Sequence, residues 1–216
     1  TSADHAELAE GTGQGHALRA FTASLDAETG DRGRFLAQGV LGRGGMGEVI
    51  EAFDPALERA VAVKLALAPD DPVAMRRFVF EAQIASQLEH PNIVPVYDAG
   101  VMEDESPWYA MRKVEGRTLT SVLQGLAAGT DDPEDWSLPH LLSAFVQICN
   151  AVAYAHERGV LHRDLKPDNI MFGRFGEVLL VDWGVARLMG LDRADGGKPF
   201  ATPITTPGGR PPLSSA

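Results

Sequence analysis

The chain has 216 residues, a length that allows one domain, or one domain and an additional segment. Its 44% hydrophobic and 23% charged residues exclude a wholly disordered protein, and its net charge of −11 makes nucleic acids and anionic membranes poor partners. The single cysteine, Cys149, excludes an intrachain disulfide and a zinc site built from several cysteines. No signal-peptide pattern opens the chain and no apolar run approaches the ~18 residues of a membrane span, so we expect a soluble, cytoplasmic protein.

The first and last segments are predicted to be irregular. Residues 1–33 are rich in Gly, Ala and acidic residues without a sustained period, which predicts a flexible arm. Residues 196–216 contain four Gly and five Pro, which predicts a disordered tail. The structured part is therefore expected between these two segments.

Short strands dominate the first half of the structured part. Alternation and turn residues predict strands at Phe35–Leu41, Gly47–Asp54, Ala60–Ala66, Ile93–Val101 and Trp108–Val114. A helix is predicted from about Val73 to Glu89, with Phe78, Ala85 and Leu88 on one face. Glu81 lies on that same face, and this carboxylate is expected to have a partner because an unpaired buried charge is costly.

Helices dominate the second half. One helix is predicted near Thr118–Ala128, a polar loop at 129–136, and a longer helix that Ser137 caps and Gly159 ends. The longer helix has a broad apolar face, made of Leu141, Leu142, Phe145, Ile148, Cys149 and Val152. Two short strands are predicted after it, at Ile170–Phe172 and Val178–Val181.

A glycine-rich loop joins the first two strands. It reads Gly42-Arg43-Gly44-Gly45-Met46-Gly47-Glu48-Val49 and matches G-x-G-x-x-G-x-V, in which the absent side chains let backbone N–H groups approach phosphate oxygens. By itself the motif also fits a hairpin turn without a ligand, or the dinucleotide site of a Rossmann oxidoreductase. The Rossmann site requires a helix directly after the loop, so the strand that follows here disfavours that class.

A lysine lies near the end of the third strand. Strand alternation places Ala62 and Lys64 on one face, where the ammonium can bind phosphate oxygens. A lone strand lysine is usually a solvated side chain. The inward Glu81 favours a functional role for Lys64, because a Lys64–Glu81 pair would satisfy both charges and fix the direction of the lysine side chain.

The strongest motif is His162-Arg163-Asp164-Leu165-Lys166-Pro167-Asp168-Asn169, which Asp182-Trp183-Gly184 follows. Asp164 can accept a hydroxyl proton, and Lys166 can offset charge on a phosphoryl group in transfer. Asn169 and Asp182 offer the hard oxygen ligands that suit Mg²⁺. The alternative is a charged surface loop without a function. The chance that such a loop contains these residues in this order is negligible.

Taken in this order, the motifs resemble those of a bacterial eukaryotic-like (Hanks-type) serine/threonine protein kinase, from about Phe35 to Arg187. The resemblance implies an α+β, two-lobed fold with a strand-rich N-lobe at 34–113 and a partial helical C-lobe at 114–195. It also implies ATP and Mg²⁺ in the cleft and a protein substrate. A lysine two residues after Asp164 is typical of serine/threonine kinases rather than tyrosine kinases.

The resemblance further implies a role for each motif residue. Lys64 would bind the α- and β-phosphates and pair with Glu81. Asp164 would orient the substrate hydroxyl, with Lys166 beside the γ-phosphate. The loop from Gly42 to Gly47 would cover the phosphates, and Asn169 and Asp182 would hold Mg²⁺. The adenine would lie among Val49, Ala62 and Met171, with Met111 as gatekeeper and the backbone of Arg112–Val114 as hinge.

The chain departs from the family pattern at two places. Trp183 stands where the family usually has Phe, and no A-P-E motif or following helices come after Asp182-Trp183-Gly184. We therefore expect an incomplete domain that is a poor kinase by itself and that associates with itself through apolar surface on the longer helix. The alternative is a non-catalytic nucleotide-binding or scaffold fragment.

Threonines near the end of the chain are candidate phosphorylation sites. Arg163 precedes Asp164 and could pair with a phosphate on that segment. The candidates are Thr202, Thr205 and Thr206.

Overall fold

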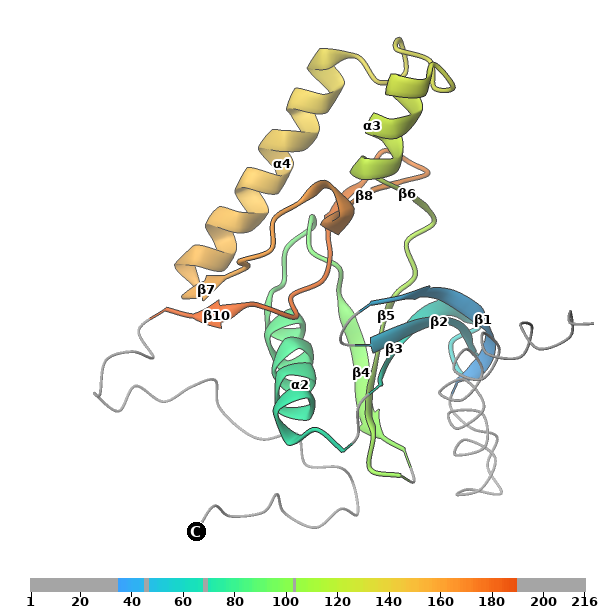
Figure 1. The fold of residues 1–216 in the computed structure, drawn as a ribbon, viewed down its shortest axis with the longest axis vertical. Coiled ribbons are helices and arrows are strands. Elements are labelled where there is room, and N and C mark those ends of the chain that lie inside the picture. The colour runs from blue at the N-terminus through green and yellow to red at the C-terminus, as the bar shows by residue number, and fades with distance from the viewer. Residues whose placement is uncertain (1–34, 45–46, 68–69, 103, 190–216) are drawn as a thin grey trace, which may run out of the picture.

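The computed structural model of the protein describes residues 35–44, 47–67, 70–102 and 104–189. The predicted arm at 1–33 and tail at 196–216, with its three threonines, lie outside the described residues, as do Gly45 and Met46 of the glycine-rich loop. Figure 1 shows a strand-rich part that also contains α2, and a second part that contains α3 and α4.

The strand-rich part is built on a five-stranded antiparallel sheet within the described residues, in the order β1-β2-β3-β5-β4. Its strands are β1 (Leu36–Arg43), β2 (Gly47–Asp54), β3 (Arg59–Ala66), β4 (Val96–Val101) and β5 (Pro107–Arg112). Alternation in β3 gives the sheet two different faces. Val61, Val63 and Leu65 pack into one apolar cluster with Phe35. Lys64 is therefore directed to the opposite face, as predicted.

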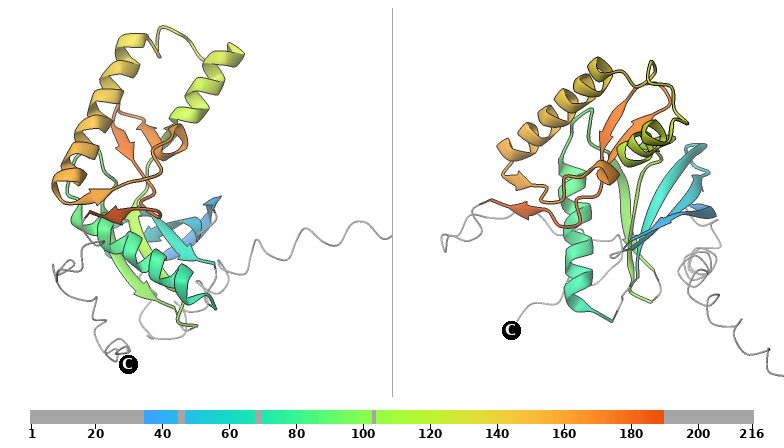
Figure 2. Two further views of the ribbon diagram at one scale, coloured as in Figure 1. Left: turned by 60° about the vertical axis from the view of Figure 1, so that its left-hand side comes forward. Right: turned by 45° about the horizontal axis from the view of Figure 1, so that its top comes forward.

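Helix α2 (Pro72–Gln87) covers that opposite face beside β4 and β5, as Figure 2 shows. The Asp71 side chain accepts hydrogen bonds from the N–H groups of Val73 and Ala74, which fixes the start of the helix. Phe78 and Glu81 are buried on the inward face of α2, so the predicted amphipathic face is confirmed.

The second part consists of α3, α4 and short strands. Its elements are β6 (Gly116–Thr118), α3 (Leu119–Ala128), α4 (Leu138–Glu157), β7 (Val160–Leu161), the 3₁₀ turn η1 (Pro167–Asn169), β8 (Ile170–Gly173), β9 (Val178–Leu180) and β10 (Arg187–Leu188). Strand β8 pairs with β6 and β9, and β7 pairs with β10. Gly129 and Gly159 have φ of +68° and +75° where α3 and α4 end, which only glycine adopts without strain.

Some predicted boundaries were wrong. The strand predicted at Ile93–Val101 begins only at Val96, and Ile93 makes a single isolated bridge to Leu180. Pro95 explains the late start, because proline has no N–H to donate to a strand partner. Ser137 is the N-cap residue of α4, but its side chain makes no capping hydrogen bond.

Helix α4 is apolar on two sides. Ala144, Ile148, Ala151 and Ala155 form a buried stripe against the core that α2, β9 and Trp183 share. A second, exposed stripe runs along another side of the helix, made of Leu138, Leu142, Phe145 and Cys149. The sequence had placed Ile148 on the uncovered face, and this was wrong because Ile148 is only 6% exposed.

Helix α4 also bears on the prediction that no apolar run approaches a membrane span, because its mean hydropathy is high although polar residues interrupt it. Among the described residues, α4 is one helix that is long and apolar enough to cross a membrane by length and composition alone. A core helix of a soluble protein passes the same test. Length and composition are therefore weak evidence for a membrane span in α4.

Candidate active site

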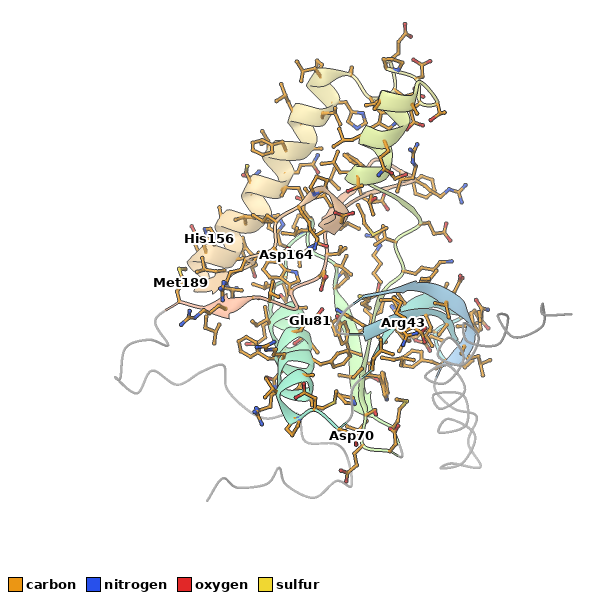
Figure 3. All side chains as sticks on the ribbon, in the orientation of Figure 1. Arg43, Asp70, Glu81, His156, Asp164 and Met189 are labelled. Carbon is orange, nitrogen blue, oxygen red and sulfur yellow. The ribbon has the colours of Figure 1, made fainter. Side chains whose placement is uncertain are left out.

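Lys64 is held between two carboxylates from distant parts of the chain. Its Nζ lies 2.7 Å from Glu81 Oε1 on α2 and 3.3 Å from Asp182 Oδ1, which follows β9. The predicted Lys64–Glu81 pair is confirmed. Figure 3 shows Glu81 on α2 and Asp164 just above it, where the two parts of the molecule meet.

The charges around Lys64 keep its ammonium protonated. Burial pushes the pKa of Lys64 down, but the charges and hydrogen bonds of Glu81 and Asp182 outweigh it, so this pKa lies above its ordinary value. Burial raises the pKa of Glu81, while Lys64 and a hydrogen bond from Tyr109 oppose that shift. The site thus presents a fixed positive charge beside the partly exposed carboxylate of Asp182.

The described part of the glycine-rich loop lies over β3. A side chain at Gly47 would place its Cβ 2.7 Å from the carbonyl oxygen of Leu65 and 3.3 Å from Lys64 Cε, so only glycine fits there. A Cβ at Gly42 or Gly44 would meet no atom within 4 Å. The Gly44 N–H donates to the Gly47 carbonyl at 2.9 Å, so the contact of this loop with phosphates stays a prediction.

The catalytic loop brings three predicted residues together. Lys166 Nζ lies 2.7 Å from Asp164 Oδ2, and Asn169 Nδ2 donates to the same oxygen at 3.1 Å and to the Asp164 carbonyl at 2.8 Å. The hydrogen bond from Lys166, followed by that from Asn169, lowers the pKa of Asp164. Asp164 is therefore an ionised acceptor at neutral pH, as a residue that orients a hydroxyl must be.

The residues predicted to hold Mg²⁺ fit that ion chemically. Within the described residues, the Asn169 side chain donates both of its hydrogen bonds from Nδ2, so its Oδ1 oxygen would be the ligand atom. Asp182 contributes a carboxylate whose Oδ1 already accepts from Lys64 and from the Gly184 N–H. In the part of the chain that the structure describes, no group of three or more His, Cys, Asp or Glu residues could hold a metal. The ion would therefore take its remaining ligands from phosphate oxygens and water.

The predicted adenine site draws on both parts of the molecule. Ala62 lies opposite Met111 in the β3–β5 register, and Val49 lies opposite Lys64 in the β2–β3 register. Met171 comes from β8 in the second part, and Val114 from the segment that joins the two parts. These residues therefore come from both parts of the molecule, and their contact with adenine stays a prediction.

The hinge side chains form ion pairs that the sequence did not predict. Arg112 Nη2 lies 2.7 Å from Glu177 Oε1, and Lys113 Nζ pairs with Glu51 of β2. Glu115 adds a pair with Arg174 at 3.3 Å. These pairs link β2, the hinge and the β8–β9 hairpin. The charged hinge side chains therefore bind partners on other elements and do not contact the hinge backbone through these pairs. No sequence pattern signalled them, because the partners are far apart along the chain.

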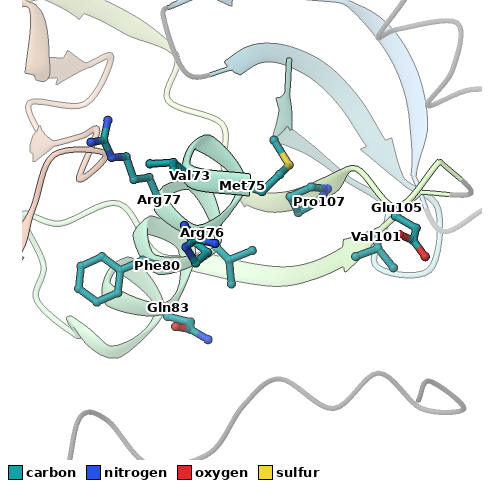
Figure 4. A pocket seen from close by; sticks show the side chains of 10 residues that line it. Val73, Met75, Arg76, Arg77, Phe80, Gln83, Val101, Glu105 and Pro107 are labelled. Carbon is teal, nitrogen blue, oxygen red and sulfur yellow. The ribbon is translucent and has the colours of Figure 1, made fainter. Parts of the chain in front are cut away.

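A separate groove of about 650 Å³ lies on the other side of α2 (Figure 4). Val73 and Phe80 of α2 line it, together with Val101 and Pro107 at the ends of β4 and β5. None of the predicted site residues lines it. The groove is therefore distinct from the site of Lys64 and Asp164.

Comparison with known proteins agrees with this geometry. Residues 35–212 match the protein kinase domain family. The chain is similar to the serine/threonine-protein kinase PknD of Protochlamydia amoebophila, with 44% identity over 156 residues, and to that of Chlamydia muridarum, with 47% identity over 153 residues. The aligned regions cover 69% and 68% of this chain but only 16% of each relative. The chain thus spans a small share of the curated relatives it matches.

His162 connects the catalytic loop to the Asp182 segment and is expected to make the fold acid-sensitive. Its Nδ1 accepts from the Asp164 N–H at 3.3 Å and its Nε2 lies 3.2 Å from the Val181 carbonyl, an arrangement that the neutral ring satisfies. Burial lowers the pKa of His162, so the unfolded chain takes up a proton before the folded one does. The free energy of unfolding should therefore fall as the pH drops below about 6.5, by up to about 1.4 kcal/mol per pH unit from this residue.

Urea denaturation from pH 8 to pH 5 measures this effect. His162→Phe should make the acid decline shallower, whereas His156→Phe, at an exposed position of α4, should leave the slope unchanged. An identical slope in wild type and His162→Phe would show that His162 does not titrate in this way.

Proposed function

Because this chain belongs to the protein kinase family, we propose that it transfers the γ-phosphate of ATP to Ser or Thr hydroxyls of proteins. The observation that carries the proposal is the Lys64 ammonium, paired with Glu81 on one side and Asp182 on the other. Lys166 supports the serine/threonine class, because it contacts Asp164 from two residues further along the chain. We also propose a cytoplasmic location, where ATP is available.

Each residue of the proposed site has a separate role in the reaction. Lys64 binds phosphate oxygens of ATP, and its carboxylate partners hold the ammonium in place. Asp164 accepts a hydrogen bond from the substrate hydroxyl and turns its oxygen toward the γ-phosphate. Lys166 offsets the charge on the phosphoryl group in transfer. Mg²⁺, when held by Asn169 and Asp182, neutralises phosphate charge.

The alternative function is a nucleotide-binding scaffold without phosphotransfer. Both functions share the Lys64 cleft, so nucleotide binding does not separate them. Phosphate transfer to a protein does. The close contact of Lys166 and Asn169 with Asp164 favours the catalytic function, because a scaffold has no need of an ordered acceptor for a hydroxyl.

Mg-ATP is expected to stabilise the folded chain. At 100 times its dissociation constant, a ligand adds about 2.7 kcal/mol to the free energy of unfolding, which for a domain of this size raises the melting temperature by roughly 5–10 °C. Lys64→Met should abolish the shift, because the phosphate contact is lost. Thermal melting with and without Mg-ATP measures it.

Arg59→Met is the matched control, since it removes a cation of the same strand that pairs with Asp54 rather than with the predicted phosphate site. It should keep the full shift. Absence of any shift in wild type at millimolar Mg-ATP would contradict an ATP site in this cleft.

Asp164→Asn is expected to lower phosphotransfer about 10²–10⁴-fold while most Mg-ATP binding remains, because Asp164 serves the hydroxyl and not the nucleotide. Asp168→Asn makes the same chemical change at an exposed position of the same loop and should transfer at close to the wild-type rate. Radiolabel transfer from ATP to casein and to the chain itself is the measurement. An unchanged rate in Asp164→Asn would remove Asp164 from this role.

We further propose that this chain associates with itself through the exposed stripe of α4. Phe145 is 63% exposed in the middle of that stripe, and a large uncovered apolar patch promotes association. Phe145→Glu should lower the sedimentation coefficient toward that of a monomer, whereas Ser143→Glu, on a polar side of α4, should not. A wild-type chain that sediments as a monomer at high micromolar concentration would overturn this proposal.

A further inference from the structure

A buried tyrosine hydroxyl shares the carboxylate that pairs with Lys64. Tyr109 lies opposite Lys64 in the β3–β5 register, so both side chains extend from the same face of the sheet. Tyr109 Oη donates to Glu81 Oε1 at 2.7 Å, and Lys64 Nζ donates to the same oxygen at 2.7 Å. Tyr109 is 3% exposed and Glu81 is 1% exposed, so water has little access to the three groups.

We propose that Tyr109 is a positioning residue for the nucleotide site, whose hydroxyl fixes the Glu81 carboxylate toward Lys64 and so fixes the ammonium that meets the phosphates. The inference rests on the proposed function for the meaning of the nucleotide site. Its structural core, the bond between a hydroxyl and a carboxylate, does not depend on phosphotransfer.

The carboxylate needs this second donor. Among the described residues, Glu81 Oε2 is buried and has no hydrogen-bond partner, so every bond of this carboxylate is made through Oε1. A single bond to the flexible side chain of Lys64 would fix the distance between the charges but not the orientation of the carboxylate. Tyr109 supplies a second direction from a rigid strand, and two donors at one oxygen define where that oxygen lies.

The same hydroxyl favours the ionised form of Glu81. The charged and titratable groups that face this carboxylate are Lys64 of β3, Tyr109 of β5 and, more remotely, Asp182 after β9. Burial and Asp182 disfavour the negative charge, whereas Lys64 and Tyr109 stabilise it. A Lys64–Glu81 ion pair in so dry a place therefore depends on the hydroxyl as well as on the ammonium.

The tyrosine itself is held by packing that does not involve its hydroxyl. Its ring centroid lies 5.3 Å from that of Phe78 in a tilted arrangement, and the two residues share an apolar cluster with Ala66 and Ala82. Tyr109→Phe would therefore keep the ring in place and remove one polar atom. The substitution isolates the hydrogen bond from the packing.

Tyr109→Phe is expected to weaken Mg-ATP binding about tenfold in titration calorimetry, which corresponds to about 1.4 kcal/mol. Tyr97→Phe is the matched control: it removes a hydroxyl from the neighbouring strand β4, where the partly exposed ring stacks on Arg59. This variant should bind Mg-ATP as wild type does. Wild-type affinity in Tyr109→Phe would overturn the proposal.

A double-mutant cycle with Glu81→Met separates positioning from packing, because methionine keeps the bulk of the side chain and removes the acceptor. Tyr109→Phe should lower the ratio of folded to unfolded chain about tenfold in the wild-type background and less than twofold in the Glu81→Met background, measured by urea denaturation without nucleotide. Equal losses in both backgrounds would show that Tyr109 only packs, and the proposal would be wrong. If wild type binds no Mg-ATP, the proposed function fails on its own, while this cycle still decides whether Tyr109 holds Glu81.

Discussion

A buried ammonium has to be paired, and this requirement at Lys64 determines how the rest of the structure is assembled. The charge comes from β3, one partner from α2 and the other from the segment after β9. Removing one partner of a buried pair costs about 3–5 kcal/mol, a large part of the 5–15 kcal/mol that stabilises an ordinary domain. The sheet, α2 and the second part of the molecule are therefore fixed relative to one another at a single nitrogen atom.

Apolar packing supports this arrangement from two directions. On the sheet side, Phe78 and Tyr109 exclude water from the ion pair. Toward the second part of the molecule, Ile84 of α2 and Leu88, which caps the end of that helix, enter a core that also contains Leu180 and Trp183. Helix α2 thus contacts both parts along one face, with Glu81 between the two apolar regions. The non-directional packing places the helix, and the polar contacts set its rotation and register.

Local sequence patterns predicted the features that depend on spacing within one element. Glu81 could be identified as inward because Phe78, Ala85 and Leu88 share its helix face, and strand alternation placed Lys64 on a face where it could pair with this carboxylate. Tyr109 could not be identified, because alternation gives the face of a strand residue but not its neighbour on another element. The predicted uncovered face of α4 failed at Ile148 for a similar reason: a helix that is apolar on two sides does not reveal which side meets the core. Strands β6, β7 and β10 were not predicted because they are too short to show the alternation of apolar and polar residues that marks a strand.

The two loops that carry the predicted chemistry have uncommon backbone conformations on either side of one aromatic contact. Arg163 and Asp182 both have positive φ, +67° and +63°, which a side chain other than glycine adopts only at a cost. Between them, the rings of His162 and Trp183 pack with centroids 4.6 Å apart, and the imidazole bonds to backbone groups of both loops. The indole Nε1 of Trp183 is buried with no hydrogen-bond partner among the described residues, a cost of about 1–3 kcal/mol that a phenylalanine would not carry. The fold tolerates that cost because the large ring fills the core beneath Asp182. The position of the Asp182 carboxylate relative to Asp164 therefore depends on the ring at 183 as well as on the two acidic residues themselves.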